Sequence, residues 1–176
     1  MHEICEILDY KRKPITKSKR ILGDYPYFGA NGIQDYVKNY IFDGDFILMG
    51  EDGSVVKNDN TPVLHWIENR KIWVNNHAHV LGVKDMRFKL KYIYYYLSTI
   101  DVSKIVKGMP PKINQDNMKK IEILMPPILV QEYIVSILEK LEKLVNDVNE
   151  GLPKEIDLRQ KEYEYYREKL LDFPKN

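Results

Sequence analysis

The stretch PPILVQEYIVSILEKLEKLVNDV, residues 126–148, decides how the chain is divided. Two consecutive prolines begin it, and proline is poorly tolerated both inside a helix and inside a central strand. Beyond them, apolar residues recur at alternating intervals of four and three, the spacing of the a and d positions of a heptad. The residues of this seam are Val130, Ile134, Ile137, Leu141, Leu144 and Val148. We therefore expect a long amphipathic helix after residue 126, with its apolar seam packed on another surface.

Gly151-Leu152-Pro153 follows this helix. Proline removes a backbone hydrogen bond and clashes with the preceding helical turn. The sequence therefore predicts two consecutive helical segments rather than one uniform coiled coil. The apolar pattern resumes one residue out of register at Leu152, Ile156, Tyr163, Tyr166 and Leu170. We assign residues 127–176 to a helical spacer.

Upstream of the prolines, short apolar or aromatic runs alternate with turn residues between positions 24 and 83. The pairs Asn31-Gly32 and Asp43-Gly44 place glycine where hairpins require a positive φ. Runs separated by roughly eight to twelve residues predict a compact, mostly antiparallel sheet. The expected fold is thus α+β, with a β-rich domain over residues 1–126 and the helical spacer after it.

Three further elements are predicted between the sheet and the prolines. Residues 88–99, FKLKYIYYYLST, are apolar over a broad face and predict a helix packed on the sheet. Asn114 is a suitable cap for a short helix over residues 115–118. The apolar run at 121–125 predicts a last strand.

Composition excludes several classes of protein. The 176 residues are 44% hydrophobic and 30% charged, values typical of a soluble globular protein. The sequence contains no run of about 18 apolar residues, as a membrane span requires, and the first residues do not resemble a signal peptide. Cys5 is the only cysteine, which excludes internal disulfides and cysteine-clustered zinc. We expect a soluble cytoplasmic protein without a metal.

The charge is unevenly distributed along the chain. Residues 1–125 carry 19 Lys and Arg against 15 Asp and Glu, a net charge of +4, whereas residues 126–176 carry 8 against 11, a net charge of −3. Six basic residues lie between Lys11 and Arg20 with no acidic residue among them. Such a run is commonly a solvated surface segment, but on a basic domain it favours a polyanionic partner.

Motifs of catalysis are not apparent in the sequence. We find neither a glycine-rich phosphate loop nor the Asn-Pro-Pro-aromatic tetrapeptide of adenine methyltransferases. The most suggestive local chemistry is Asn75-Asn76-His77-Ala78-His79, whose two histidines would share one face of a strand, an arrangement that suits metal ligands. The same run is also compatible with a hydrogen-bonded turn, or with contacts to bases and phosphates.

Five stretches occur in a characteristic order: YPYFGANGIQDYV (25–37), FILMGEDGSVV (46–56), IWVNNHAHVL (72–81), KGMPPKINQDNMKKIEILMPPILVQ (107–131) and GLPKEIDLRQKEYEYYREKLL (151–171). Together they resemble the specificity (S) subunits of type I restriction–modification systems. A chain of that family usually carries two target-recognition domains, separated and followed by long helical spacers. This chain has one recognition-like unit and one spacer-like unit, and so resembles a half-subunit.

The resemblance implies a noncatalytic, cofactor-free adaptor that reads one half of a bipartite site in double-stranded DNA. It also implies methyltransferase (M) and restriction (R) subunits as partners, with residues 127–176 docking on M. The heptad seam named above would join two copies in a homodimer. The expected phosphate contacts are Lys17, Lys19, Arg20, Lys57, Lys107 and Lys112. The expected base readers are Asn31, Gln34, Asn58 and His77.

Two other functions are compatible with the sequence. The first is a small nuclease or hydrolase that uses the neighbourhood of His77 and His79. Acidic residues close to these histidines in space would favour it. The second is an assembly module that binds methyltransferase subunits without reading DNA.

Overall fold

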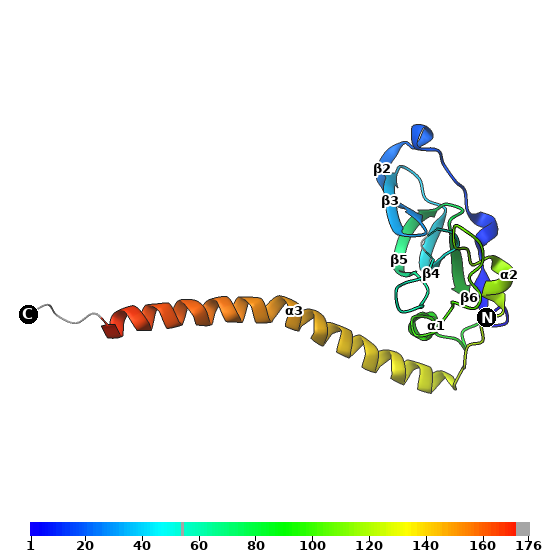
Figure 1. Cartoon of the computed structure of the whole chain (residues 1–176). Coiled ribbons are helices and arrows are strands. Elements are labelled where there is room, and N and C mark those ends of the chain that lie inside the picture. The colour runs from blue at the N-terminus through cyan, green and yellow to red at the C-terminus, as the bar shows by residue number, and fades with distance from the viewer. Residues whose placement is uncertain (54, 172–176) are drawn as a thin grey trace, which may run out of the picture. The chain divides into compact units, whose positions relative to one another are not determined.

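A computed structural model describes residues 1–53 and 55–171 and, in the last helix, the side chains up to residue 143 and those of residues 156, 158–162, 164 and 165. The chain divides into two compact units, Met1–Glu132 and Tyr133–Asn176 (Figure 1). Each unit is described separately below. No helix among the described residues is long and apolar enough to cross a membrane.

Strands of the first unit form a mostly antiparallel sheet, as the sequence predicts. In the described residues its order is β1-β6-β4-β5-β2-β3. The β2–β5 pair is parallel and the other pairs are antiparallel. The strands are β1 (Cys5–Ile7), β2 (Leu22–Gly29), β3 (Gly32–Val37), β4 (Phe42–Gly50), β5 (Leu64–Val74) and β6 (Ala78–Val83).

Glycines with positive φ lie at both of the predicted pairs, Asn31-Gly32 and Asp43-Gly44, but the two glycines have different structural roles. Gly32, with φ of 105°, closes the hairpin between β2 and β3. Gly44, with φ of 125°, lies inside β4, at a register shift against β5. The Asp43-Gly44 prediction of a hairpin turn is therefore wrong, because the positive φ makes a bulge in a continuous strand.

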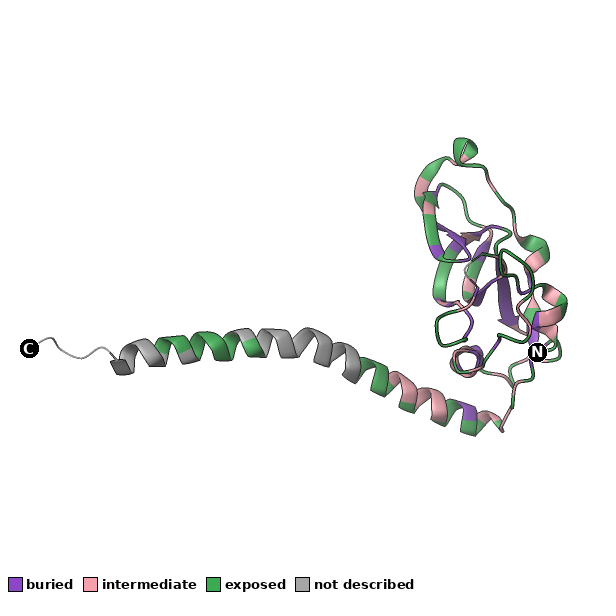
Figure 2. Cartoon of the chain, in the orientation of Figure 1, coloured by how far each residue is buried: buried purple, intermediate pink, exposed green. Residues whose placement is uncertain are grey.

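The core is centred on β4. Ile47, Leu48 and Met49 are consecutive and completely buried, and because side chains alternate along a strand, both faces of the sheet are covered at this point (Figure 2). Leu48 packs in a cluster with residues of β2, β5 and β6. Helix α1 (Leu90–Leu97) contacts β4 and buries Ile93 and Leu97. This helix confirms the prediction for residues 88–99.

The segment after α1 confirms one prediction and contradicts another. Asn114 caps α2 (Gln115–Lys119), since its side chain accepts a hydrogen bond from the backbone N–H of Asn117 at 2.8 Å. Residues 121–125 do not form a strand. The reason is that their carbonyl groups bond to donors outside a ladder: the hydroxyl of Tyr92 donates to the Leu124 carbonyl at 2.8 Å.

A single helix, α3 (Ile128–Leu171), follows the proline pair. The predicted break at residues 151–153 is therefore wrong. One proline removes one backbone hydrogen bond, and a helix can bend at that point without ending when both flanks are good helix formers. In the predicted seam, Val130, Ile137 and Leu141 are exposed and Ile134 is half-buried. The side chains of the other two seam residues, Leu144 and Val148, lie outside the described residues.

Gln131, in the first turn of α3, is 1% exposed and makes three hydrogen bonds within the first unit. Its side-chain carbonyl accepts from the N–H of Lys89 at 2.8 Å, and its amide donates to the carbonyls of Pro126 at 2.8 Å and Arg87 at 3.2 Å. Next to it, Glu132 pairs with the Lys89 ammonium at 2.7 Å. The first turn of α3 is thus fixed to the segment before α1.

Replacing Gln131 with Ala should lower the free energy of unfolding of the first unit by about 1–3 kcal/mol, because buried polar groups lose their partners. Urea denaturation followed by tryptophan fluorescence measures this, since Trp66 and Trp73 both lie in this unit. The exposed control Asn58→Ala should shift the value by less than about 0.5 kcal/mol. Equal effects of the two substitutions would contradict the role given to Gln131.

Candidate DNA interface

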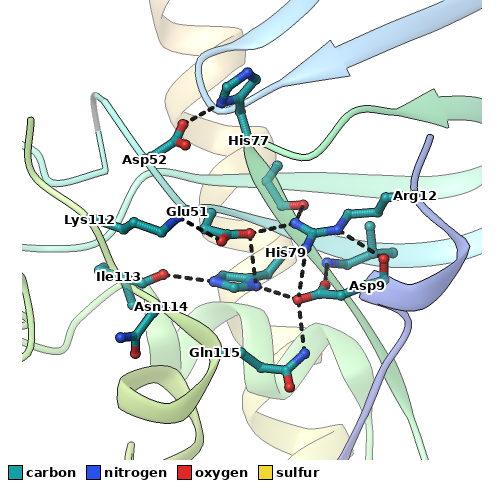
Figure 3. Close-up of polar contacts among 12 residues, drawn as sticks. Asp9, Arg12, Glu51, Asp52, His77, His79, Lys112, Ile113, Asn114 and Gln115 are labelled. Atoms are coloured by element: carbon teal, nitrogen blue, oxygen red, sulfur yellow. Dashed lines mark hydrogen bonds and ion pairs between the residues drawn. The ribbon is translucent and has the colours of Figure 1, made fainter. Parts of the chain in front are cut away.

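His79, on β6, is completely buried between two elements that lie far from it in the sequence (Figure 3). Its Nε2 faces the carbonyl oxygen of Ile113 at 2.8 Å, and its Nδ1 faces Oδ2 of Asp9 at 2.6 Å. Asp9 lies in the short 3-10 helix η1 (Asp9–Lys11). The imidazole therefore joins the start of the chain to the segment that precedes α2.

The hydrogen bonds determine the protonation of this ring. A carbonyl oxygen only accepts, so Nε2 of His79 carries a proton. Burial alone would raise the pKa of Asp9, but hydrogen bonds from His79 and from the Val80 N–H, with the charges of His79 and Arg12, hold this pKa below its ordinary value. Asp9 is therefore ionised at neutral pH, and its contact with Nδ1 at 2.6 Å holds the ring in place.

Glu51, directly after β4, is the second carboxylate beside this ring. Its Oε2 lies 3.8 Å from Nδ1 of His79 and 2.7 Å from Nη1 of Arg12. Arg12 also lies 3.4 Å from Asp9, and the Lys112 ammonium lies 3.3 Å from the other Glu51 oxygen. We call these five residues the His79 cluster. Its two carboxylates are matched by two cations, Arg12 and Lys112, so each carboxylate has a cationic partner.

The ligand atoms of Asp9, Glu51 and His79 lie within 4.8 Å of one another, close enough to hold a metal ion. The partners of these atoms argue against that use. Both ring nitrogens of His79 already have partners, in Asp9 and the Ile113 carbonyl, and Arg12 and Lys112 pair with the carboxylates. A metal ligand must offer a free lone pair, so the cluster is better explained as an ion network that holds backbone segments together.

The cluster anchors a loop at residues 107–112. Lys107 and Lys112 exchange backbone hydrogen bonds of 2.9 and 2.8 Å, which close the loop at its base. The Ile113 N–H donates to the Glu51 carbonyl at 2.9 Å, and the Gly53 N–H donates to the Pro111 carbonyl at 3.0 Å. Met109, at the tip, is 100% exposed. A basic loop thus projects from a base that is fixed to the sheet.

A row of polar side chains continues from this base. Asp52, which bridges to Lys112 through the backbone, accepts from His77 Nδ1 at 2.5 Å. The His77 N–H donates to the side-chain carbonyl of Asn75 at 2.8 Å, and the Asn75 amide donates to Gln34 Oε1 at 3.2 Å. We call the loop 107–112 together with His77 and Gln34 the polar strip. It brings together four of the residues predicted to contact DNA.

The other predicted contacts lie elsewhere in the first unit. Lys17 and Lys19 are exposed in the 3-10 helix η2 (Lys17–Lys19). Arg20 is already paired, with Asp35 at 3.2 Å, and its guanidinium lies 4.2 Å from the ring centroid of Tyr27. The remaining three predicted contacts, Asn31, Lys57 and Asn58, lie at exposed positions in turns.

His77 and His79 do not form the joint metal site considered from the sequence. β6 begins at Ala78, so His77 precedes the strand. Figure 3 shows His77 directed to Asp52, apart from the group around His79. Sequence reasoning missed the roles of Asp9, Arg12 and Glu51. The available signal was His79 itself, an ionisable residue inside the apolar run Ala78–Leu81.

Comparisons with known proteins agree with this architecture. A family model described as the type I restriction modification DNA specificity domain matches residues 1–158. A putative type I restriction enzyme specificity subunit of Haemophilus influenzae is 38% identical over 98% of this chain and 45% of its own length. The specificity subunit of the MpnII type I restriction enzyme of Mycoplasma pneumoniae is 33% identical over 97% of this chain and 51% of its own.

Solved structures share the fold. The S subunit of a type I restriction–modification system from M. genitalium superposes with a TM-score of 0.66 at 14% identity, over 90% of this chain and 42% of that one. The chain thus spans about half the length of these relatives. The matches confirm the family predicted from the sequence. The chain belongs to the family of type I restriction modification DNA specificity domains.

Proposed function

We propose that this chain reads one half of a bipartite site in double-stranded DNA, as a noncatalytic specificity component of a type I restriction–modification complex. The observation that supports the proposal is that a chain of this family carries the polar strip. Its loop presents Lys107 and Lys112 beside the side chains of His77 and Gln34. Ammonium groups suit phosphates, whereas amides and imidazoles can hydrogen-bond to base edges.

The His79 cluster supports this function indirectly. A loop that contacts DNA must present its lysines in a fixed position, because ordering a mobile loop on binding costs affinity. The cluster holds the base of the loop through the Ile113 carbonyl and the Lys112 ammonium. Asp9, Glu51 and His79 are therefore positioning residues, which act on DNA through the loop.

We further propose that α3 assembles the complex, both by pairing with a second copy and by docking on methyltransferase subunits, with restriction subunits joining the assembly. Apolar side chains of the seam support this. Ile137 and Leu141 are 38% and 51% exposed, so burying the rest of each side chain contributes about half of the roughly 1.5–3 kcal/mol that full burial gives. A two-fold homodimer uses one surface twice and would read two inverted copies of a half-site.

The two alternative functions are less well supported. Acidic groups do gather around His79, as a nuclease would require, but Arg12 and Lys112 neutralise them. An assembly module that does not read DNA leaves the polar strip unexplained. A gel shift with duplex DNA, in the presence of the methyltransferase subunit, separates this alternative from the specificity component.

Substituting Lys107 with Ala should weaken the binding of every duplex sequence and reduce the slope of log K against log salt by about 0.9, because one phosphate contact is lost. Gln34→Ala should instead change the preference among sequences and leave the slope unchanged. Fluorescence anisotropy over a salt series measures both. Lys71→Ala, at an exposed lysine paired with Asp43, is the control. Unchanged slope and preference in both variants would remove the polar strip from the interface.

Replacing Asp9 with Asn should lower the free energy of unfolding at neutral pH by on the order of 3 kcal/mol, because it breaks a buried ion pair. The folded-state pKa of Asp9 lies below its ordinary 3.8, so its contribution is complete well above that pH and is lost as the pH falls through the folded value. The difference between wild type and variant should therefore shrink below about pH 5. The exposed control Asp43→Asn should cost less than about 0.5 kcal/mol.

Replacing Ile137 and Leu141 with Asp should convert a dimer to a monomer while the first unit stays folded, because charge would then face the shared seam. Sedimentation equilibrium measures the mass. Ser136→Asp with Lys143→Asp, at heptad positions off the seam, should leave the dimer intact. A wild-type chain that is monomeric at tens of micromolar, about −6 kcal/mol of association free energy, would contradict self-association and favour assembly through methyltransferase subunits.

A further inference from the structure

A cleft of about 410 Å³ opens between β1 and α2, outside the polar strip. The residues that line it are His2, Cys5, Ile7, Tyr10, Lys84, Gln115 and Lys119. A neighbouring hollow of about 420 Å³ shares His2 and Lys119 and extends along residues 120–123. Neither hollow contains a residue that the sequence predicts to contact DNA.

Positive charge predominates among the residues that line the first cleft. Among the described residues that line it, none is acidic. The Lys84 ammonium donates to the backbone carbonyl of His2, which is a neutral partner. The carboxylate nearest to the Lys119 ammonium is that of Asp116, at 3.9 Å, and its side chain is 85% exposed. Such an exposed pair is weak, so both lysines can attract an anion.

The other residues that line the cleft suit a phosphate ester better than a metal ion or another cation. Cys5 and Ile7 give an apolar floor, and burial raises the pKa of the Cys5 thiol to about 11, so that the thiol adds no negative charge. Tyr10 and Gln115 contribute hydroxyl and amide groups. The volume lies within the range of roughly 300–1,000 Å³ that is typical of sites for small ligands.

We propose that this cleft is a phosphate-binding site and that its ligand is a phosphodiester of the DNA backbone. The proposal rests on the proposed function, because a DNA-reading chain supplies that ligand. Gln115 connects the cleft to the polar strip, since its amide donates to Asp9 of the His79 cluster at 3.2 Å. The cleft thus extends the phosphate contacts beyond the loop 107–112 to the other side of α2.

The test uses the full chain and duplex DNA of arbitrary sequence, because phosphate contacts do not depend on sequence. The variant Lys84→Gln with Lys119→Gln removes both charges and keeps the length of the side chains. The control Lys71→Gln with Lys89→Gln removes the same charge from two lysines that do not line the cleft, one on β5 and one just before α1. Thermal melting verifies that each variant is folded, and Lys84→Arg with Lys119→Arg should restore binding.

We expect the cleft variant to lose about 1.8 from the salt slope, so that between roughly 50 and 200 mM salt its affinity falls about tenfold less than that of wild type. The control should keep the wild-type slope. An unchanged slope in the cleft variant overturns the proposal, whatever happens to sequence preference. If the salt slope of the cleft variant is unchanged but the variant loses the binding of inorganic phosphate that calorimetry shows for wild type, the ligand is free phosphate rather than DNA. If wild type binds no duplex, the proposed function itself fails.

Discussion

A buried, hydrogen-bonded histidine is the constraint on which the first unit depends. His79 is completely buried, and both of its ring nitrogens need partners because an unpaired polar group is costly to bury. The Ile113 carbonyl and Asp9 supply these partners, while Arg12 and Lys112 pair with the carboxylates of Asp9 and Glu51. The start of the chain, the end of β4 and the segment before α2 are therefore held together by one network.

This network gives the polar strip its position. The sheet fixes β4 and β6 through backbone ladders, and the cluster at their ends fixes the base of the loop 107–112. Residues in the exposed part of the loop can then be substituted without disturbing the core. Such a division between a fixed scaffold and a reading surface is what binding loops on rigid frameworks require.

Local patterns predicted most of the fold because the forces concerned are local. The Asn31-Gly32 turn, α1 and the Asn114 cap each follow from a few adjacent residues. The His79 cluster could not be predicted in this way, because its partners Asp9 and Ile113 lie 70 and 34 positions from His79. Hydrophobicity alone also misassigned residues 121–125, where the carbonyls of Ile121 and Leu124 bond to the Met1 amino group and the Tyr92 hydroxyl rather than to a neighbouring strand.

The hydrogen bond between Nε2 of His79 and the Ile113 carbonyl tests most directly whether this imidazole holds the loop to the sheet. Nitrogen-15 NMR of the histidine ring identifies which ring nitrogens carry protons. We expect a proton on Nε2 of His79, with a coupling to the Ile113 carbonyl. A His79 signal with an unprotonated Nε2 at neutral pH would contradict this.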